Sequence, residues 1–178
     1  MTGRRRPYLR RQDGFTLIEL VIALAIGVIV MTGLTSVVLT ATRGVAIASN
    51  QVQASSQLRT FDSFVTDDVA LSGIPATSSC GTSATPCTTQ ALVLSGTSVS
   101  NSTNPLPAAY SVSYAWDGTS FVDRTVNGTS AHAATDVTRF AWYVDTSGAF
   151  PTVVVAMTVT VGGYSQSQTF QFVPRLNP

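Results

Sequence analysis

An apolar segment near the N-terminus constrains this chain most, because it contains a single carboxylate. Leu17 to Leu39 comprises twenty-three residues, of which only Glu19 is charged. A segment of this length can span a bilayer as a helix. An ionised side chain at membrane depth costs at least ~2.5 to 3.5 kcal/mol, so such residues are by default candidates for a functional site. Glu19 is therefore expected to have a partner.

The residues around Glu19 resemble a processing signal. The order Gly14-Phe15-Thr-Leu-Ile-Glu19-Leu follows a leader that contains Arg4, Arg5, Arg6, Arg10 and Arg11. It closely resembles the class III signal of type IV pilins and type II secretion pseudopilins. The resemblance implies that a prepilin peptidase cuts between Gly14 and Phe15 on the cytoplasmic side and methylates the new amino group of Phe15.

The same resemblance implies an assembly role for Glu19, which would attract the N-terminal amine of a neighbouring subunit. A physical argument agrees with it. A carboxylate buried in lipid is tolerated only with a partner. Once the leader is removed, no basic side chain precedes Arg43. The partner is therefore expected from another chain, which favours a polymer.

Three simpler interpretations compete. The first is an ordinary signal peptide cleaved after the small residues Ala46-Ile47-Ala48, although an apolar core of 7 to 15 residues is usual there. The second is a single-pass anchor with an incidental Glu19. The third is a twin-arginine export signal around Arg10-Arg11, which Asp13 and Glu19 fit poorly.

The charges are distributed unevenly along the chain. All ten basic residues are arginine, and five of them, with one of the nine acids, precede Phe15, so the mature chain has a net charge of −3. The basic end predicts a cytoplasmic N-terminus, with the residues after about Arg43 outside the membrane. The expected location is the cytoplasmic membrane, followed by an extracellular or periplasmic filament. An acidic exported domain weighs against broad attraction for nucleic acid.

The chain is expected to divide into a cleaved leader (1–14), a transmembrane assembly helix (15–42) and an exported domain (43–178). Within that domain we predict an amphipathic helix over 43–72, a loop over 73–107 and an antiparallel sheet over 108–174. The apolar stripe of the helix recurs at steps of three and four residues and comprises Val45, Ala48, Val52, Leu58, Phe61, Val65 and Val69. Ser72 to Pro75, with Gly73 available for a left-handed cap, is expected to end the helix.

Alternating residues predict the strands. Tyr110 to Trp116 alternates and leads through a turn at Asp117-Gly118 into Ser120 to Arg124; further strands are predicted at Val137 to Val144, Thr152 to Val161 and Tyr164 to Val173. The predicted fold is α+β, a pilin-like roll in which a long N-terminal helix packs on an antiparallel sheet of four or five strands. Between Ser78 and Pro107, only Ala91 to Leu94 resembles a strand.

The two cysteines, Cys80 and Cys87, predict a disulfide, because an exported domain meets an oxidising compartment. Two thiols without a neighbouring His or acid make a poor metal site, so no metal or cofactor is expected. No nucleophile or phosphate-loop motif is present. His132 is interpreted as a solvated loop residue and Asp67-Asp68 as a solvated helix face. We expect no enzyme.

A second, looser resemblance links the chain to W-type minor pilins and J-type pseudopilins, through Phe121-Val-Asp-Arg124, Val137-Thr-Arg-Phe140-Ala-Trp-Tyr143 and Pro174-Arg175. The expected function is a minor pilin or pseudopilin of a type IV pilus or type II secretion filament. The expected partners are prepilin peptidase, other pilin subunits, the inner-membrane assembly platform and lipid. The alternative is a competence (DNA-uptake) or adhesive tip subunit of such a filament.

Overall fold

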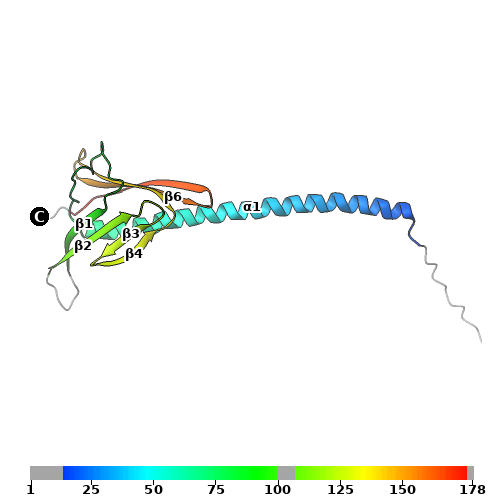
Figure 1. Ribbon diagram of the computed structural model, residues 1–178, viewed down its shortest axis with the longest axis horizontal. Helices are drawn as coiled ribbons and strands as arrows, with labels where there is room; N and C mark the ends of the chain where they lie inside the picture. Colours follow the sequence, from blue (N-terminus) through cyan, green and yellow to red (C-terminus); the bar gives the residue numbers. More distant parts are fainter. Residues whose placement is uncertain (1–13, 100–106, 176–178) are drawn as a thin grey trace, which may run out of the picture. The chain divides into compact units, whose positions relative to one another are not determined.

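The first element is a single helix, α1, which runs from Leu17 to Ala70 (Figure 1). The computed structural model describes residues 14–99 and 107–175, so the predicted basic leader lies outside the described residues except for Gly14. The chain divides into two compact units, Met1–Val45 and Ala46–Pro178.

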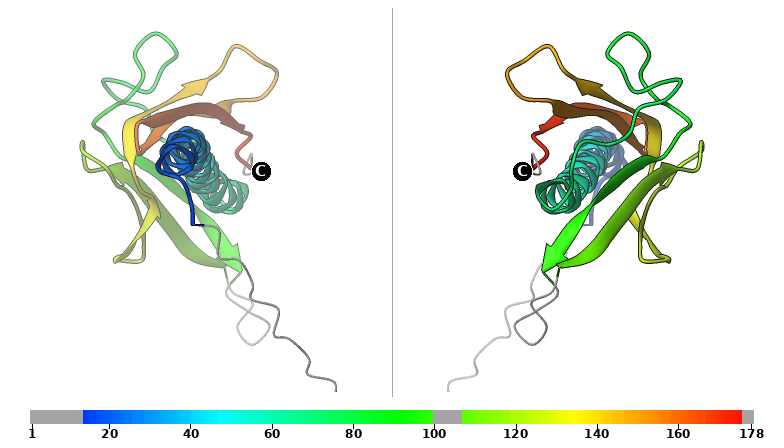
Figure 2. Two further views of the ribbon diagram at one scale, coloured as in Figure 1. Left: turned by 90° about the vertical axis from the view of Figure 1, so that its right-hand side faces the viewer. Right: turned by 90° about the vertical axis from the view of Figure 1, so that its left-hand side faces the viewer.

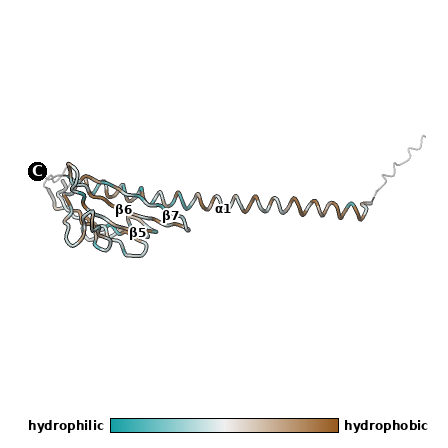
Figure 3. The backbone as a smooth tube through the Cα atoms, turned by 90° about the horizontal axis from the view of Figure 1, so that it is seen from above, coloured by the Kyte–Doolittle hydropathy of each residue, from teal (hydrophilic) through white to brown (hydrophobic). Residues whose placement is uncertain are grey.

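In the first unit α1 consists mostly of apolar residues, as its brown colouring in Figure 3 shows. All of its large apolar side chains from Leu17 to Leu39 are exposed. Its threonines satisfy their hydroxyls within the helix: Thr32 and Thr35, for example, each donate to a backbone carbonyl one turn earlier, at 2.8 Å. Such bonds let a polar residue face hydrocarbon without an unpaired donor.

The second unit contains two antiparallel sheets. Sheet A has the order β1-β2-β3-β4 and sheet B the order β5-β6-β7. The strands are β1 Leu92–Val99, β2 Pro107–Trp116, β3 Val122–Val126, β4 Thr129–Ala134, β5 Val137–Asp145, β6 Thr152–Val161 and β7 Tyr164–Phe172. Figure 2 shows both sheets curving around the helix.

The core lies where this part of α1 meets both sheets. Phe61 is fully buried, and its ring centroid lies 5.6 Å from that of Tyr114 in sheet A. On the other side it lies 6.0 Å from Phe140 and 5.6 Å from Phe170, both in sheet B. Rings at these separations interact favourably beyond the area that they bury. One helix residue therefore joins both sheets.

The α+β class is confirmed, but the prediction of one sheet of four or five strands is wrong. The seven strands form two sheets, which separate between β4 and β5. There Asp136 adopts a left-handed backbone with φ of 58°, a conformation that Asp tolerates better than most residues. The turn redirects the chain, so β5 leaves the plane of β4.

The predicted apolar stripe of α1 is only partly correct. Leu58, Phe61, Val65 and Val69 are buried as expected. Val45, Ala48 and Val52 are exposed. Asn50, whose side chain bonds the carbonyl of Gly162 in the β6–β7 turn, is near the end of sheet B, and Val45 and Ala48 precede it in the helix. Val52 lies instead on a side of the helix that lines a hollow open to solvent.

The end of the helix also differs from the prediction. Gly73 is not among the residues with a positive φ, so it is no left-handed cap. Its amide instead donates to the carbonyl of Ser95 in β1 at 2.9 Å.

Two strands lie where loops were predicted. β1 lies within the 73–107 segment, and its Gly96 approaches the chain just after α1 so closely that an added Cβ would lie 2.1 Å from the carbonyl oxygen of Leu71. β4 contains His132 and is reached through Asn127-Gly128, which have φ angles of 50° and 84°. Asn-Gly with two positive φ angles is typical of a type I′ hairpin turn, and this signal was available in the sequence.

Candidate functional site

The predicted processing site lies just before α1. Among the described residues, no atom beyond its chain neighbours lies within 4 Å of the position that a Cβ on Gly14 would occupy, and Phe15 is 80% exposed. Residues 14–99 and 107–175 therefore show no contact that requires a glycine at residue 14. A requirement for glycine there would have to come from another molecule that contacts it.

Glu19 lies in the first turn of α1 and takes part in the helix cap. Its amide donates to Oγ1 of Thr16 at 3.4 Å, and that hydroxyl donates to the Glu19 carboxylate at 3.5 Å. A threonine followed three residues later by a glutamate is the sequence pattern of a capping box; the bond from the Glu19 amide to the threonine is one of that motif's two bonds, and the carboxylate accepts from the threonine hydroxyl instead of the threonine amide. A carboxylate also interacts favourably with the N-terminal end of the helix dipole. The side chain thus has a local role besides the one predicted in assembly.

The described part of the chain contains one helix that is long and apolar enough to cross a membrane. Within α1, an eighteen-residue window reaches a mean hydropathy of 2.6, and none of it is buried within the chain. Its length meets the requirement for a membrane span.

These features agree with a known sequence family. The model of the prokaryotic N-terminal methylation motif matches residues 9–35. The motif is characteristic of type IV pilins and pseudopilins, so the N-terminal segment of the chain is similar to that of these proteins. No curated protein and no solved structure matches the chain. The apolar helix and the motif together fit a membrane-anchored subunit, and they point to a structural protein rather than an enzyme.

The second unit contains a buried charge that was not predicted from the sequence. The side chain of Asp68 is only 2% exposed, and both of its oxygens bond Arg124, at 2.6 and 2.7 Å. The hydroxyls of Tyr110 and Tyr114 also donate to this carboxylate. The Arg124 guanidinium lies 5.4 Å from the ring centroid of Phe64 on α1, within the range of a cation–π contact. These residues attach the helix to sheet A.

The interpretation of Asp67-Asp68 as a solvated pair is therefore wrong for Asp68, while Asp67 is exposed as expected. The spacing could have predicted this burial, because Asp68 follows Phe61 by seven residues and so lies on the same, buried face of the helix. Burial alone would raise the pKa of Asp68, but hydrogen bonds from Arg124, Tyr110 and Tyr114 outweigh it and hold the pKa below its usual value. Burial and the bond to Asp68 raise the pKa of Tyr110 to about 12.

These shifts predict how stability depends on pH. A depressed carboxylate pKa gives stability above the unfolded value of about 4 that is lost as the pH falls through the folded pKa. A raised tyrosine pKa gives stability below about 10 that is lost as the pH rises toward 12. Denaturant midpoints measured from pH 2 to 12 should therefore fall at both ends. The decrease in the midpoint at low pH should be smaller in Asp68→Asn. A decrease as large as that of the wild type would show that Asp68 does not cause it.

The disulfide loop covers one edge of sheet B. Cys80 and Cys87 form a disulfide, and Cys87 exchanges backbone hydrogen bonds of 2.8 and 2.9 Å with Trp142 in β5. The Trp142 indole also donates to the carbonyl of Gln90 at 2.9 Å. The bridge thus holds a loop against the outer edge of β5.

His132 was expected in a loop, but it lies on β4, and its partner is Asp123. Its Nδ1 is 2.6 Å from the Asp123 carboxylate, and its ring stacks on Phe121 at 4.5 Å. All three side chains lie at least partly exposed on sheet A. Among residues 14–99 and 107–175, no group of three His, Cys, Asp or Glu side chains is placed to hold a metal ion.

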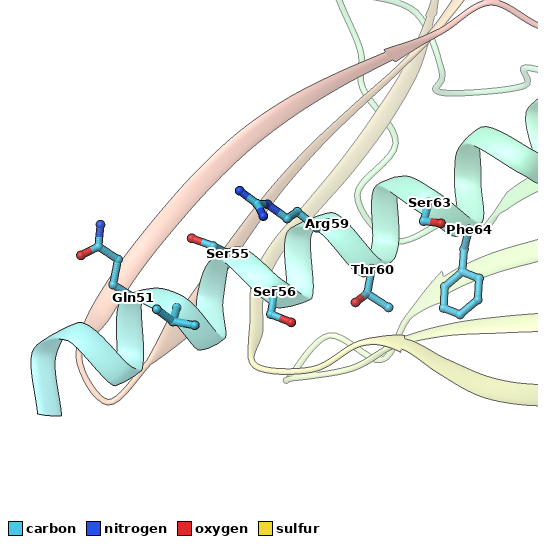
Figure 4. A pocket seen from close by; sticks show the side chains of 8 residues that line it. Gln51, Ser55, Ser56, Arg59, Thr60, Ser63 and Phe64 are labelled. Atoms are coloured by element: carbon cyan, nitrogen blue, oxygen red, sulfur yellow. The ribbon is translucent and has the colours of Figure 1, made fainter. Parts of the chain in front are cut away.

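A hollow of about 700 Å³ adjoins only α1 (Figure 4). Its lining consists of Gln51, Val52, Ser55, Ser56, Arg59, Thr60, Ser63 and Phe64. A catalytic or ligand site is usually lined by polar groups that converge from several elements. Because every lining side chain here projects from one helix, the hollow is a helix surface facing outward and shows no catalytic arrangement.

Proposed function

We propose that the chain is a minor pilin or pseudopilin, a membrane-inserted subunit that prepilin peptidase processes and that assembles into, or primes, a type IV pilus or type II secretion filament. The observation that carries this proposal is the unbroken motif from Gly14 through Phe15 to Glu19 at the start of an apolar helix. The minor-subunit role rests on the looser resemblance of the strand segments.

Glycine at residue 14 supports processing by an external enzyme. In the described part of the chain, the space around Gly14 is open, so a side chain there would meet none of the described residues beyond its chain neighbours. A peptidase that closes on the backbone next to the scissile bond gives glycine a reason to be there, since only glycine lets another backbone approach so closely.

Glu19 supports assembly, because the nearby chain supplies no basic side chain to pair with its charge. In the proposed filament its carboxylate pairs with the Phe15 amine of a neighbouring subunit. The segment from Phe15 to Thr42 carries no basic side chain, so the pairing charge is supplied by a chain terminus. The assembly platform in the inner membrane and surrounding lipid are the other proposed partners. A competence or adhesive tip subunit would share this N-terminus, and the net charge of −3 does not favour its DNA-binding form.

Processing gives the direct test. The mature protein is expected to begin at Phe15 with an N-methylated amino group, as mass spectrometry of the protein isolated from cells with a prepilin peptidase will show. Gly14→Val should retain the leader, whereas Gly44→Val, at another glycine with open space around it, should be processed normally. A mature protein that begins at Ser49 would instead establish cleavage by an ordinary signal peptidase.

A further inference from the structure

The outer edge of β7 is unprotected. β7 pairs with β6 through nine consecutive residues without a register shift. Among the described residues, no other backbone group bonds to it. Natural proteins guard such edges with charged residues, proline, bulges or short strands. The β7 sequence YSQSQTFQF contains no charged residue and no proline, so it offers a long edge for another strand.

The outer edges of the other strands are covered to different extents. The disulfide loop covers the edge of β5, since the amide of Val144 donates to Gly81 and that of Cys87 to Trp142, both at 2.8 Å. The segment after α1 meets β1, where the Gly73 amide bonds Ser95. β4 pairs only with β3, and its residues 129–132 are exposed. In the described part of the chain, β4 and β7 are therefore the uncovered edges.

β7 runs in the same direction as α1. Asn50 contacts Gly162 just before the strand, at 3.3 Å, and Ser55 contacts Gln166 within it, at 2.9 Å. Further along, Phe61 meets Phe170. Beyond the strand, the amide of Arg175 bonds the carbonyl of Ser72 at 3.1 Å. Successive helix positions thus meet successive positions of β7.

β4 runs in the opposite direction. Its Ala131 pairs with Arg124 of β3, which bonds Asp68 near the end of the helix. Just after β4, the amide of Thr135 bonds the side chain of Gln57, eleven residues earlier in α1, at 3.1 Å. The strand therefore runs back toward the N-terminal end of the helix. In two copies whose helices point the same way, β7 of one and β4 of the other are antiparallel.

We propose that β7 of one copy pairs antiparallel with β4 of a second copy in the same orientation, as an added strand. The inference rests on the proposed function, because subunits that insert α1 into one membrane share its polarity. Antiparallel pairing of β7 with β7 would oppose the two helices, and parallel pairing is the less stable ladder. The facing strands contain no Asp, Glu, Lys or Arg, so no like charges repel.

The contact joins two different surfaces, so each added copy leaves one β4 and one β7 edge free. Head-to-tail contacts of this kind continue without limit unless they close into a ring. The exported units would thus reinforce the polymer that the N-terminal helices build, through backbone hydrogen bonds that tolerate variation in side chains.

Cysteine cross-linking in full-length, co-expressed chains tests the proposal. One chain carries a cysteine at each of residues 167–169 in turn, and the other at each of residues 130–132, all of which are exposed. Side chains directly opposite across a strand pair have Cβ atoms about 4.5 to 5.5 Å apart, which a disulfide can bridge with small adjustment. Cys80 and Cys87 are bonded to each other, so the introduced thiols are the reactive ones.

After mild oxidation, at least one mixed pair should give a disulfide-linked dimer, several-fold above either chain alone. A chain with both cysteines of that pair should give a ladder of oligomers. Dimers from residue 168 alone would show β7–β7 pairing, and no cross-link in any mixed pair would show that the edges do not meet; either result overturns the proposal. The same gels also show whether the leader has been removed. Chains that are processed but not cross-linked would refute only the edge contact, whereas chains that keep the leader would count against the proposed function.

Discussion

Replacing Asp68 with alanine is expected to lower the free energy of unfolding by about 3 to 5 kcal/mol, the usual cost of breaking a buried ion pair. The substitution leaves Arg124 facing a nearly closed site and removes the acceptor of the Tyr110 and Tyr114 hydroxyls. Denaturant unfolding of the full-length protein in detergent, followed by the fluorescence of Trp116 and Trp142, measures the effect.

Asp67 provides a matched control for this experiment. It is the adjacent acid on the same helix and is exposed, so Asp67→Ala should change stability by no more than about 0.5 kcal/mol. Arg124→Lys should be destabilising too, because lysine cannot present the paired donors that contact both oxygens of Asp68. Equal stabilities for Asp67→Ala and Asp68→Ala would show that the buried cluster does not hold the helix to sheet A.

Glu19→Ala is expected to reduce the recovery of the subunit in sheared filaments to a few per cent of wild type or less. In the assembled filament the substitution would leave a terminal amine unpaired, and breaking a buried pair costs about 3 to 5 kcal/mol, more than a hundredfold in an equilibrium constant. Membrane insertion and cleavage after Gly14 should persist. Fractionation, N-terminal mass spectrometry and quantification of sheared filaments distinguish these steps.

The helix cap at Glu19 makes two further variants decisive. Glu19→Gln keeps a side chain that suits a capping box and removes the charge, so it should fail in assembly as Glu19→Ala does. Thr16→Ala removes the N-cap hydroxyl that bonds Glu19 and keeps the carboxylate, so it should assemble. Normal assembly of Glu19→Gln together with failure of Thr16→Ala would assign Glu19 to the cap rather than to a pairing charge.

The sequence by itself was sufficient for features that depend on neighbouring residues. The motif from Gly14 to Glu19 and the apolar run after it are contiguous, so the pilin-like N-terminus and the long helix follow directly. The alternation in Val137 to Val144 and in Thr152 to Val161 predicted β5 and β6, because side chains on successive residues of a strand face opposite sides. The Asp117-Gly118 pair likewise predicted the turn between β2 and β3.

Only the tertiary structure decided features that depend on residues far apart in the chain. Whether seven strands form one sheet or two depends on how the chain turns at Asp136 and on which faces cover Phe61. The local sequence of the helix predicts that Asp68 is solvated. It is buried because Arg124, fifty-six residues later, bonds to it from sheet A. Strand edges are also a tertiary property: the disulfide loop lies against β5 and the segment after α1 against β1, whereas no described segment pairs with the outer edges of β4 and β7. Periodicity describes one element at a time, whereas pairing, burial of charge and edge protection arise between elements.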